Sequence, residues 1–519
     1  MGYPKHAIMI AKKISLYIAL STLSCLASAQ SYRPANFTDA DRLEKIESTY
    51  TIIDKLYKDF AEENHWPGMA YGIVVDGKLV HSGGVGYTDI AAKIPADKSS
   101  DFRIASMTKS LTAMAILKLR DEGKLKLDDP AYLYIPEMKG MKYLTKDATP
   151  VTIKNLLTHT AGYPEDNPWG DRQLAVSDDE LIALYKKGVS FSNNPGLKYE
   201  YSNLGFATLG YIIKKVSGKT YQDYITQYIL NPLGMTHTYW EYTKVPKNKL
   251  ALGYRWLDGK WVEQPLLHDG AYGAMGGLIT TIEDFSKYMA AHMDAWPPRD
   301  DAETLPIKRS SIREMQYPWD VNYLSANAKT PTGRPCPNVS AYCYGLRWAK
   351  DCDNRVYVGH TGGLPGFGSQ WNIMPDYGVG VVVFGNLTYA NAGAINNRVL
   401  DTLLVLSAVK PRALPASAIL NQRKADLLKV ISNWDTAKAS GIFADNFFMD
   451  YFPDKLKAAT TEAFAKAGKI IAVSAVVAEN QMRGFFIMQG ESANIKVAFT
   501  LTPESPGLIQ EYHLDGVVK

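Results

Sequence analysis

The chain has 519 residues, of which 46% are hydrophobic and 21% are charged, and its formal net charge is +4. This ordinary globular composition excludes a wholly disordered or fibrous protein. The length predicts one large domain and a smaller one, because single cores stop growing near ~250–300 residues.

Residues 1–29 have the pattern of a secretory signal peptide. Three lysines precede the apolar run Ile14–Leu26, and the small residues that follow end at Ala29. We therefore expect cleavage after Ala29 and a periplasmic or secreted protein. The segment carries three lysines and no Arg, Asp or Glu, so its loss lowers the net charge from +4 to +1. That balance gives no electrostatic case for nucleic-acid binding.

Two other interpretations of this segment stay open. One is an uncleaved membrane anchor, although the run is short and rich in Ser and Thr for a bilayer span. The other is a lipoprotein modified at Cys25, although Thr22 stands where such sites usually have a larger aliphatic residue. No later apolar run is long enough for a membrane span, so none is expected in the mature protein. The oligomeric state is not predicted.

The next elements in chain order are a helix and a hairpin. Residues 44–63 are amphipathic with helical periodicity. The apolar runs Ala70–Val75 and Lys78–Val85 then flank Asp76-Gly77. This dipeptide favours the tight turn of a β-hairpin, in which both central residues need positive φ.

Two helices are predicted in the middle of the chain. Residues 106–122 are apolar nearly all round and end at Gly123, as in a buried helix. Residues 203–217 form the second helix, with Gly218 as its C-cap. Successive antiparallel strands follow at Gly345–Trp348, Val356–Thr361, Ser369–Met374 and Val379–Phe384.

Strands therefore open and close the main domain, and helices occupy its middle. The strands from the two ends must meet in one sheet, which predicts an α+β fold: an antiparallel sheet flanked by helices, with an all-helical subregion. We assign residues 30–410 to this domain and residues 411–420 to a linker. Residues 421–519 are predicted to form a small α+β domain with two short helices and strands at Ile470–Glu479, Arg483–Gln489 and Asn494–Leu501.

The first candidate catalytic element is Ser106-Met107-Thr108-Lys109. Residues i and i+3 of a helix lie on one face, about one turn apart. A serine hydroxyl needs a neighbouring base to act as a nucleophile, and a lysine serves as that base only when burial or a nearby cation lowers its pKa. The apolar residues that follow Lys109 favour such burial. Ser-x-x-Lys alone is a weak motif, however, because two common residues recur at this spacing by chance.

Two further elements carry suitable chemistry. Tyr201-Ser202-Asn203 stands just before the second helix, where a tyrosine can relay a proton and an asparagine can hold an amide or the lysine. His360-Thr361-Gly362-Gly363 stands at the end of an apolar strand, where glycines allow close approach of a substrate backbone. Each element alone is better explained by an ordinary structural role.

Together, in this order and context, the three elements resemble the serine β-lactamase and penicillin-binding-protein superfamily, specifically its class C β-lactamase-like branch. That branch includes esterases, D-aminopeptidases and D,D-peptidases. The resemblance covers roughly residues 45–405. It also includes the stretches Leu156–Gly162, Pro195-Gly196, Pro232–Met235, Gly276–Leu278 and Gly359–Gly363.

The resemblance implies a β-lactamase/transpeptidase-like fold and a serine hydrolase that forms an acyl-enzyme at Ser106, with no cofactor and no metal. Lys109 would be the partner base and Tyr201 the proton relay. Asn203 would contact the substrate amide. The oxyanion hole would be formed by the backbone N–H groups of Ser106 and Gly363, and the strand residues His360, Thr361 and Gly362 would line the substrate site.

His360 departs from the class C pattern, which has a lysine at this place. A neutral histidine would hold a substrate carboxylate poorly, so we expect an esterase, D-aminopeptidase or D,D-peptidase rather than an efficient β-lactamase. Three alternatives stay open: a weak β-lactamase, a penicillin-binding sensor that acylates without efficient turnover, and a scaffold that has lost activity. His159 is expected to be structural, because Lys109 already fills the role of base.

Cys336, Cys343 and Cys352 remain after signal cleavage. An odd count in an exported protein leaves one thiol over, and the pairing cannot be deduced from the sequence. The Pro- and Asp-rich segment Trp296–Tyr344 is a candidate lid. The role of residues 421–519 is open between covering the site, dimerisation and binding a cell-envelope partner.

Overall fold

The computed structural model describes residues 32–330 and 333–517. The predicted signal peptide lies outside the described residues. Contacts divide the chain into two compact units, of which the larger spans Asp39–Pro411. Of the described residues, the smaller contains 412–517 and also 32–38, a segment that the sequence analysis assigned to the main domain.

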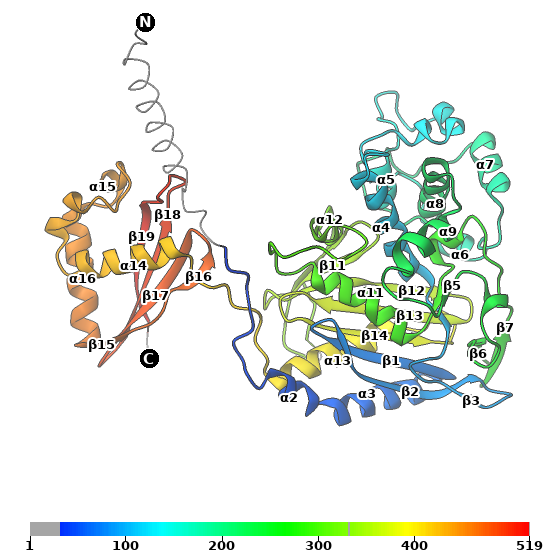
Figure 1. Ribbon diagram of the computed structural model, residues 1–519, viewed down its shortest axis with the longest axis horizontal. Coiled ribbons are helices and arrows are strands. Elements are labelled where there is room, and N and C mark those ends of the chain that lie inside the picture. The colour runs from blue at the N-terminus through cyan, green and yellow to red at the C-terminus, as the bar shows by residue number, and fades with distance from the viewer. Residues whose placement is uncertain (1–31, 331–332, 518–519) are drawn as a thin grey trace, which may run out of the picture. The chain divides into compact units, whose positions relative to one another are not determined.

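A nine-stranded antiparallel sheet organises the larger unit, in the order β3-β2-β1-β14-β13-β12-β11-β10-β9 (Figure 1). β1 and β2 form the predicted hairpin, with Asp76 and Gly77 at φ 50° and 76°. β1 also pairs with β14, so the two ends of the domain meet as expected. The strands are β1 Gly68–Val75, β2 Lys78–Asp89, β3 Ile94–Pro95, β9 Asp320–Ser325, β10 Asn338–Tyr342, β11 Arg347–Lys350, β12 Val356–Leu364, β13 Phe367–Met374 and β14 Val379–Gly385.

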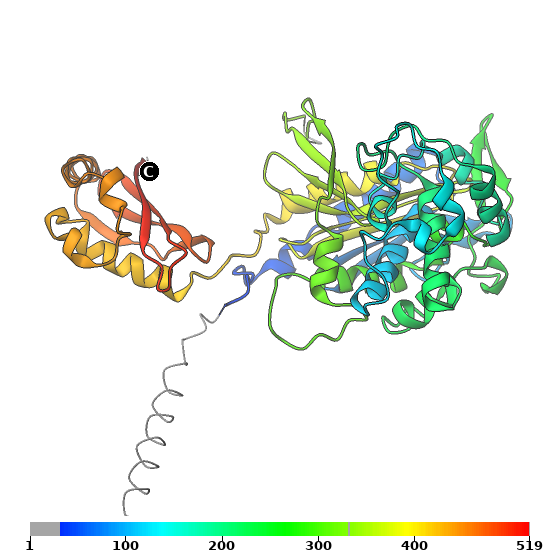
Figure 2. The ribbon, with the colours of Figure 1, turned by 90° about the horizontal axis from the view of Figure 1, so that it is seen from above.

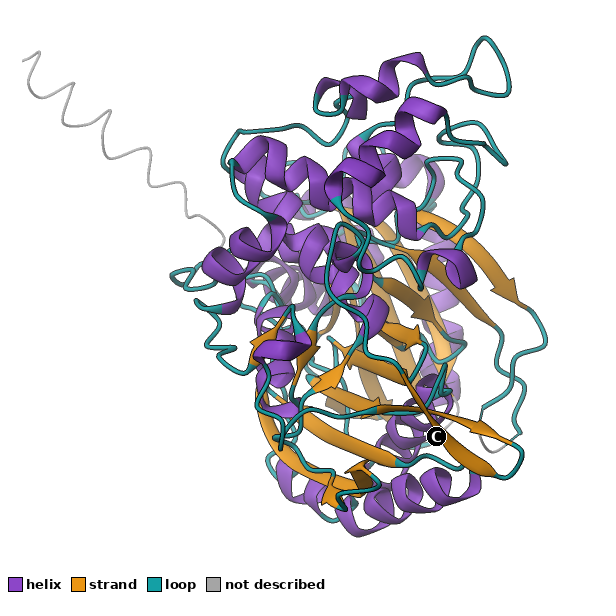
Figure 3. Ribbon diagram, turned by 90° about the vertical axis from the view of Figure 1, so that its right-hand side faces the viewer, coloured by secondary structure: helices purple, strands orange, loops and turns teal. Residues whose placement is uncertain are grey.

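Helices cover both faces of this sheet (Figures 1 and 3). Alternate residues of β1 enter opposite cores: Ile73 packs with the helices near the chain ends of the unit, and Val74 packs with the central helices. The helices are α2 Arg42–Glu47, α3 Tyr50–Glu63, α4 Thr108–Asp121, α5 Ile153–Leu157, α6 Asn167–Gly170, α7 Asp178–Lys187, α8 Asn203–Ser217, α9 Tyr221–Ile225, α10 Gly273–Gly276, α11 Ile282–Asp294, α12 Arg309–Met315 and α13 Ala392–Ser407. Short strands β4 Phe102–Arg103, β5 Thr238–Tyr239 and β8 Ile279–Thr280 form a second sheet, and β6 Gly253–Leu257 pairs with β7 Lys260–Gln264.

The two central helix predictions are confirmed closely. α8 begins at Asn203 and ends at Ser217, and Gly218 follows with φ 72°. Eleven residues of α4 are buried, in agreement with its apolar sequence, and Gly123 follows it at φ 72°. The single helix predicted over residues 44–63 is wrong in one respect. It is two helices, α2 and α3, separated at Ser48-Thr49.

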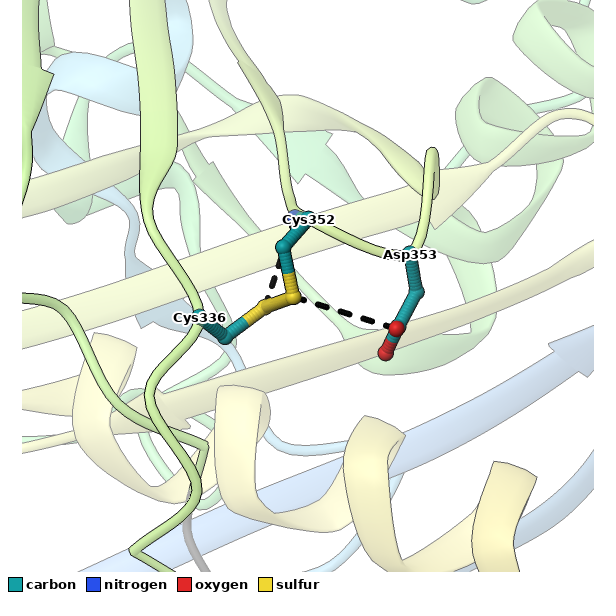
Figure 4. Close-up of side chains that lie close together, drawn as sticks. All are labelled: Cys336, Cys352 and Asp353. Carbon is teal, nitrogen blue, oxygen red and sulfur yellow. Dashed lines mark hydrogen bonds between the residues drawn. A yellow bond between two sulfur atoms is a disulfide. The ribbon is translucent and has the colours of Figure 1, made fainter.

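The segment Trp296–Tyr344 is more ordered than the sequence indicated. It contains α12 and the strands β9 and β10, which extend the sheet beyond β11 (Figure 2). Cys336 and Cys352 form a disulfide at this edge (Figure 4). Asp353 lies beside them, but the two sulfurs are bonded to each other and are not free thiolate ligands for a metal ion. Of the three cysteines in the described residues, Cys343 is left as the free thiol, and it is buried.

The smaller unit is an α+β domain with its own core. Its sheet has the order β15-β17-β18-β19, and β16 also pairs with β17. The strand predicted over Ile470–Glu479 is two strands. The elements are α14 Ala418–Val430, α15 Phe447–Asp450, α16 Pro453–Ala467, β15 Ile470–Val473, β16 Val477–Asn480, β17 Arg483–Gly490, β18 Asn494–Leu501 and β19 Ile509–Val517. Within the described ranges, no helix has the length and apolarity that crossing a membrane requires.

Candidate active site

Ser106 lies in a short 3-10 turn, Ala105–Met107, immediately before α4. Ala105 has φ 50°, a left-handed conformation that costs energy in a residue other than glycine and is typical of functional sites. The turn is held from the sheet, because the Ser369 hydroxyl donates a hydrogen bond to the Ile104 carbonyl at 2.8 Å. The nucleophile candidate therefore stands on a strained turn anchored to β13.

Gly362 makes this anchoring possible. A Cβ at this position would lie 2.2 Å from the Ile104 carbonyl oxygen and 2.3 Å from Ser369 Oγ. Neither atom is at the end of a long flexible side chain, so any larger residue would push β12 away from the turn that carries Ser106.

Lys109 is completely buried, and the nitrogen atom at the end of its side chain contacts three oxygen atoms. Its Nζ lies 3.0 Å from Ser106 Oγ, 2.7 Å from Asn203 Oδ1 and 2.9 Å from the carbonyl oxygen of Met275. Burial lowers the pKa of Lys109 to about 7, and Asp171 and Asp166 oppose this shift. A large fraction of the side chain is therefore a neutral amine near neutral pH.

The partners of Lys109 fix what the neutral amine can do. The Met275 carbonyl can only accept, and the Asn203 amide donates from Nδ2 to Asn167 Oδ1 at 3.2 Å, which orients its oxygen toward Lys109. Two N–H groups of the amine are therefore used by acceptors. Its lone pair is left to face Ser106 Oγ, which is the arrangement a general base needs.

Two carboxylates, Asp166 and Asp171, lie close enough to Lys109 to affect its pKa. Asp166 accepts hydrogen bonds from the backbone N–H groups of Asn203 at 2.6 Å and Leu204 at 2.9 Å, at the positively polarised start of α8. Asp171 accepts one from the Tyr389 hydroxyl at 3.0 Å, and burial raises its pKa to about 6. Both carboxylates favour the protonated form of Lys109.

Tyr201 is buried against the side chain of Lys109, with its ring centre 4.8 Å from Lys109 Nζ. Burial raises the pKa of Tyr201, while its hydrogen bond with Ser106 and the positive charge of Arg347 act in the opposite direction. The hydroxyl therefore stays protonated and is hydrogen-bonded with Ser106, while the ring packs against Lys109, so Tyr201 is a candidate proton relay.

His159 holds the loop that carries Tyr201. Its Nδ1 accepts a hydrogen bond from the Ser202 backbone N–H at 3.1 Å, and its ring centre lies 4.2 Å from that of Tyr201. Its carbonyl accepts a hydrogen bond from the Glu200 N–H at 2.8 Å. Burial holds the pKa of His159 well below its usual value, so the ring is neutral. These contacts agree with a structural role.

The third predicted element, His360–Gly363, lies on β12, and only about half of that strand is paired on both sides. β11 pairs with Val356–Gly359 and extends no further along β12. His360–Leu364 pairs only with β13, so its other edge is open to an extended substrate. Thr361 and Gly363 are partly exposed, and Gly363 lies beside the ring of Tyr389.

His360 itself is only 2% exposed. Its Nε2 lies 3.0 Å from the Tyr342 hydroxyl. Burial and the nearby cations Arg347 and Lys109 hold the pKa of His360 well below its usual value. The side chain is therefore neutral, and it borders a cavity together with Thr361. Its predicted place beside the substrate stays a prediction.

The predicted residues thus divide into two groups. Ser106, Lys109, Tyr201 and Asn203 meet around one buried amine, and the β12 residues flank the turn of Ser106. Sequence reasoning missed five contributors: Asp166, Asp171, Arg347, Tyr389 and the Met275 carbonyl. Only the last had a signal, because Met275 directly precedes the quoted Gly276–Leu278 stretch.

Comparison with known proteins agrees with this geometry. The Beta-lactamase family model matches residues 53–405. Protein flp of Staphylococcus aureus (strain N315) is 32% identical over 352 residues, which cover 64% of this chain and 62% of that protein. The chain therefore matches less than two thirds of the length of these Flp proteins. The putative penicillin-binding protein PbpX of Bacillus subtilis (strain 168) is 33% identical over 258 residues, covering 48% of this chain and 61% of that protein.

Two solved structures share the fold at 23% identity. The octameric penicillin-binding protein homologue from Pyrococcus abyssi has a TM-score of 0.57 and covers 92% of this chain and 96% of its own. The penicillin-binding protein from Bacillus halodurans has a TM-score of 0.52 and covers 69% and 98%. With the family model matching more than half of its length, the chain belongs to the Beta-lactamase family, within the β-lactamase and penicillin-binding-protein superfamily.

Proposed function

We propose that this protein is an exported serine hydrolase that cleaves ester, amide or peptide bonds through an acyl-enzyme on Ser106. The observation that carries the proposal is the contact between Ser106 Oγ and a buried lysine whose pKa is about 7. A lysine in water has a pKa near ~10.4 and would be almost fully protonated at pH 7.

Acylation follows from these contacts. Neutral Lys109 takes the proton of the Ser106 hydroxyl as Oγ attacks the substrate carbonyl carbon. The backbone N–H groups of Ser106 and Gly363 would stabilise the oxyanion, and each such donor contributes ~10²–10³ in rate. When the tetrahedral intermediate collapses, the leaving group takes a proton delivered through Tyr201, and the acyl group stays on Ser106.

Deacylation reverses this path with water as the nucleophile. As water attacks the acyl carbonyl, its proton passes through Tyr201 to neutral Lys109, and this proton returns to Ser106 Oγ when the tetrahedral intermediate collapses. The released acid and the regenerated hydroxyl balance the reaction. No cofactor or metal is needed for either half.

Export is part of the proposal. It is supported by the signal-peptide pattern of residues 1–29 and by the Cys336–Cys352 disulfide, since disulfides persist in oxidising compartments outside the cytosol. N-terminal sequencing of the protein isolated from its host should begin at Gln30. A protein that begins at Met1 would contradict cleavage.

A substrate panel separates hydrolysis from stable acylation. The panel contains p-nitrophenyl esters, D- and L-aminoacyl p-nitroanilides, a D-Ala-D-Ala peptide and a cephalosporin. We expect multiple turnovers with at least one ester, amide or peptide, and loss of turnover in Ser106→Ala. Stable labelling by fluorescent penicillin without turnover would instead favour a penicillin-binding sensor, as the names of PbpX and the structural neighbours suggest. Full activity in Ser106→Ala would overturn the assignment.

A further inference from the structure

Tyr389 lies in the loop that follows β14, and its backbone is held in a strained conformation. Its φ is 51°, a left-handed conformation that costs energy in a residue other than glycine. The backbone N–H donates a hydrogen bond at 3.1 Å to the carbonyl of Phe367, the first residue of β13. Strain of this kind is typical of places where a site needs a side chain in a fixed position.

The side chain of Tyr389 links two parts of the larger unit. Its ring lies beside Gly363, because a Cβ on that glycine would be 2.9 Å from Tyr389 Cδ1. Its hydroxyl donates a hydrogen bond at 3.0 Å to Asp171, which directly follows α6. One side chain therefore joins the edge of the sheet to the helical subregion.

Asp171 brings this link next to the groups that would hold the acyl half of a substrate. Asp171 Oδ1 lies 3.5 Å from Asn203 Nδ2. In the proposed reaction the Gly363 N–H binds the oxyanion, and Asn203 is the expected contact of the substrate amide. Tyr389 touches the first of these residues and reaches a neighbour of the second. An acyl chain that extends between them would therefore meet the Tyr389 ring.

The hydrogen bond to Asp171 resists displacement of the ring. Asp171 is only 3% exposed, whereas Tyr389 is 47% exposed. Burial and the Asp171 carboxylate raise the pKa of Tyr389 to about 12, so its hydroxyl keeps the proton that it donates. Moving the ring outward would leave a buried carboxylate oxygen without this donor, and a buried acceptor that loses its partner costs free energy. A long acyl chain would have to supply that free energy.

We propose that Tyr389 is a specificity residue that closes the acyl end of the site, so that the enzyme prefers esters and amides with short acyl groups. The inference rests on the proposed acyl-enzyme function. It concerns the acyl half of the substrate alone, and it gives a role to an exposed aromatic residue outside the three sequence motifs.

The test uses p-nitrophenyl acetate and p-nitrophenyl hexanoate, which have the same leaving group and differ only in the length of the acyl chain. The measured quantity is the ratio of kcat/KM for the hexanoate over the acetate. Both rates come from the same sample at the same pH. A reduced folded fraction, or a changed pKa of Lys109, therefore affects both rates and cancels in the ratio.

The wild-type protein should prefer the acetate. Tyr389→Ala removes the ring and should raise the ratio about tenfold or more, since hydrophobic pockets discriminate by roughly 10–200-fold for a single methylene. Tyr389→Phe keeps the ring but loses the hydroxyl that holds it against Asp171, so its ratio should lie between those of the wild-type protein and Tyr389→Ala. This milder variant also tests the proposal if Tyr389→Ala does not fold.

Tyr323→Ala is the matched control. Tyr323 is 65% exposed and lies on β9, the third strand from β12 in the sheet order, roughly 14 Å away. Its replacement also removes an exposed tyrosine ring, and the ratio should stay close to the wild-type value.

Failure of the inference and failure of the proposed function give different results. If the wild-type protein hydrolyses both esters through Ser106 but prefers the hexanoate, or if the Tyr389 variants keep the wild-type ratio, the limit on the acyl group is wrong and the hydrolase function stands. If neither ester is hydrolysed or acylates Ser106, the proposed function falls and the inference falls with it.

Discussion

The Nζ atom of Lys109 lies 3.0 Å from Ser106 Oγ in a fully buried position, and its two other contacts are acceptors, Asn203 Oδ1 and the Met275 carbonyl. The proposed role of Lys109 as base rests on this relationship, because a neutral amine with both N–H groups engaged turns its lone pair to the serine. Most of the testable consequences concern this contact.

Replacing Lys109 should remove most activity while leaving Ser106 in place. Lys109→Ala should lower kcat/KM by ~10²–10⁴-fold, the usual contribution of a general base. The measurement is ester hydrolysis under conditions in which circular dichroism shows the variant folded. Lys118→Ala removes a lysine from the same helix without touching Ser106 and should retain near wild-type kcat/KM. Comparable rates for the two variants would exclude Lys109 as the base.

The pH dependence should report the protonation of Lys109. Only the neutral amine acts as a base, so kcat/KM should rise with pH through about 7, the lowered pKa of Lys109, and then level off. Single-turnover acylation rates measured from pH 5 to 9 would give the pH at the midpoint of this rise. A rate that stays flat from pH 5 to 9 would show that Lys109 does not titrate in this range.

Asp171→Asn should move the rise of the acylation rate toward lower pH. The Asp171 carboxylate favours the ammonium form, so removing its charge lowers the pKa of Lys109 further. The asparagine oxygen can still accept the hydrogen bond of Tyr389. Asp178→Asn, which removes a carboxylate from the exposed pair with Lys214, is the control and should leave the rise at the wild-type pH. A shift to higher pH in Asp171→Asn would have the wrong sign for this electrostatic argument.

Asp166→Ala should reduce stability and activity together. It leaves the N–H groups of Asn203 and Leu204 without their carboxylate acceptor, which should cost about 1–2 kcal/mol of unfolding free energy. Asn203 then loses its anchor, so kcat should fall as well. Urea unfolding and ester hydrolysis measure the two effects. Unchanged stability would show that water replaces the cap.

Gly362→Ala tests the packing of β12 against the turn of Ser106. The added Cβ would lie 2.2 Å from the Ile104 carbonyl oxygen, so we expect a loss of about 1–3 kcal/mol and a lower kcat. Gly393→Ala in α13 is the matched control, because its Cβ would have no neighbour closer than 3.5 Å. Equal behaviour of the two variants in thermal unfolding and hydrolysis would contradict this packing.

Local patterns in the sequence were sufficient to place the elements that carry the main chemistry. The limits of α8 follow from a polar start at Asn203 and from Gly218, and the β1–β2 turn follows from Asp76-Gly77. The position of Ser106 at the start of a buried helix follows from the apolar residues after it. In each case the signal lies within a few residues of the feature.

Features that depend on tertiary contacts were not predictable in this way. Asp166 and Asp171 meet Asn203 only through folding, and neither stands in a recognisable pattern. Arg347 lies 5.7 Å from the centre of the Tyr201 ring, and only the folded sheet, in which β11 pairs with β12, brings the two residues together. The strand position of His360 was predictable, but its burial and its contact with Tyr342 were not, because both depend on the neighbouring strand β10.

Mass spectrometry of the acyl-enzyme tests the central claim most directly. The protein is mixed with an activated ester and quenched in acid within milliseconds to seconds, and the adduct is located by peptide mapping. The account predicts an acyl adduct on Ser106 that appears and then decays in the wild-type protein, forms much more slowly in Lys109→Ala and is absent in Ser106→Ala. An adduct on any other residue, or hydrolysis that continues in Ser106→Ala, would contradict it.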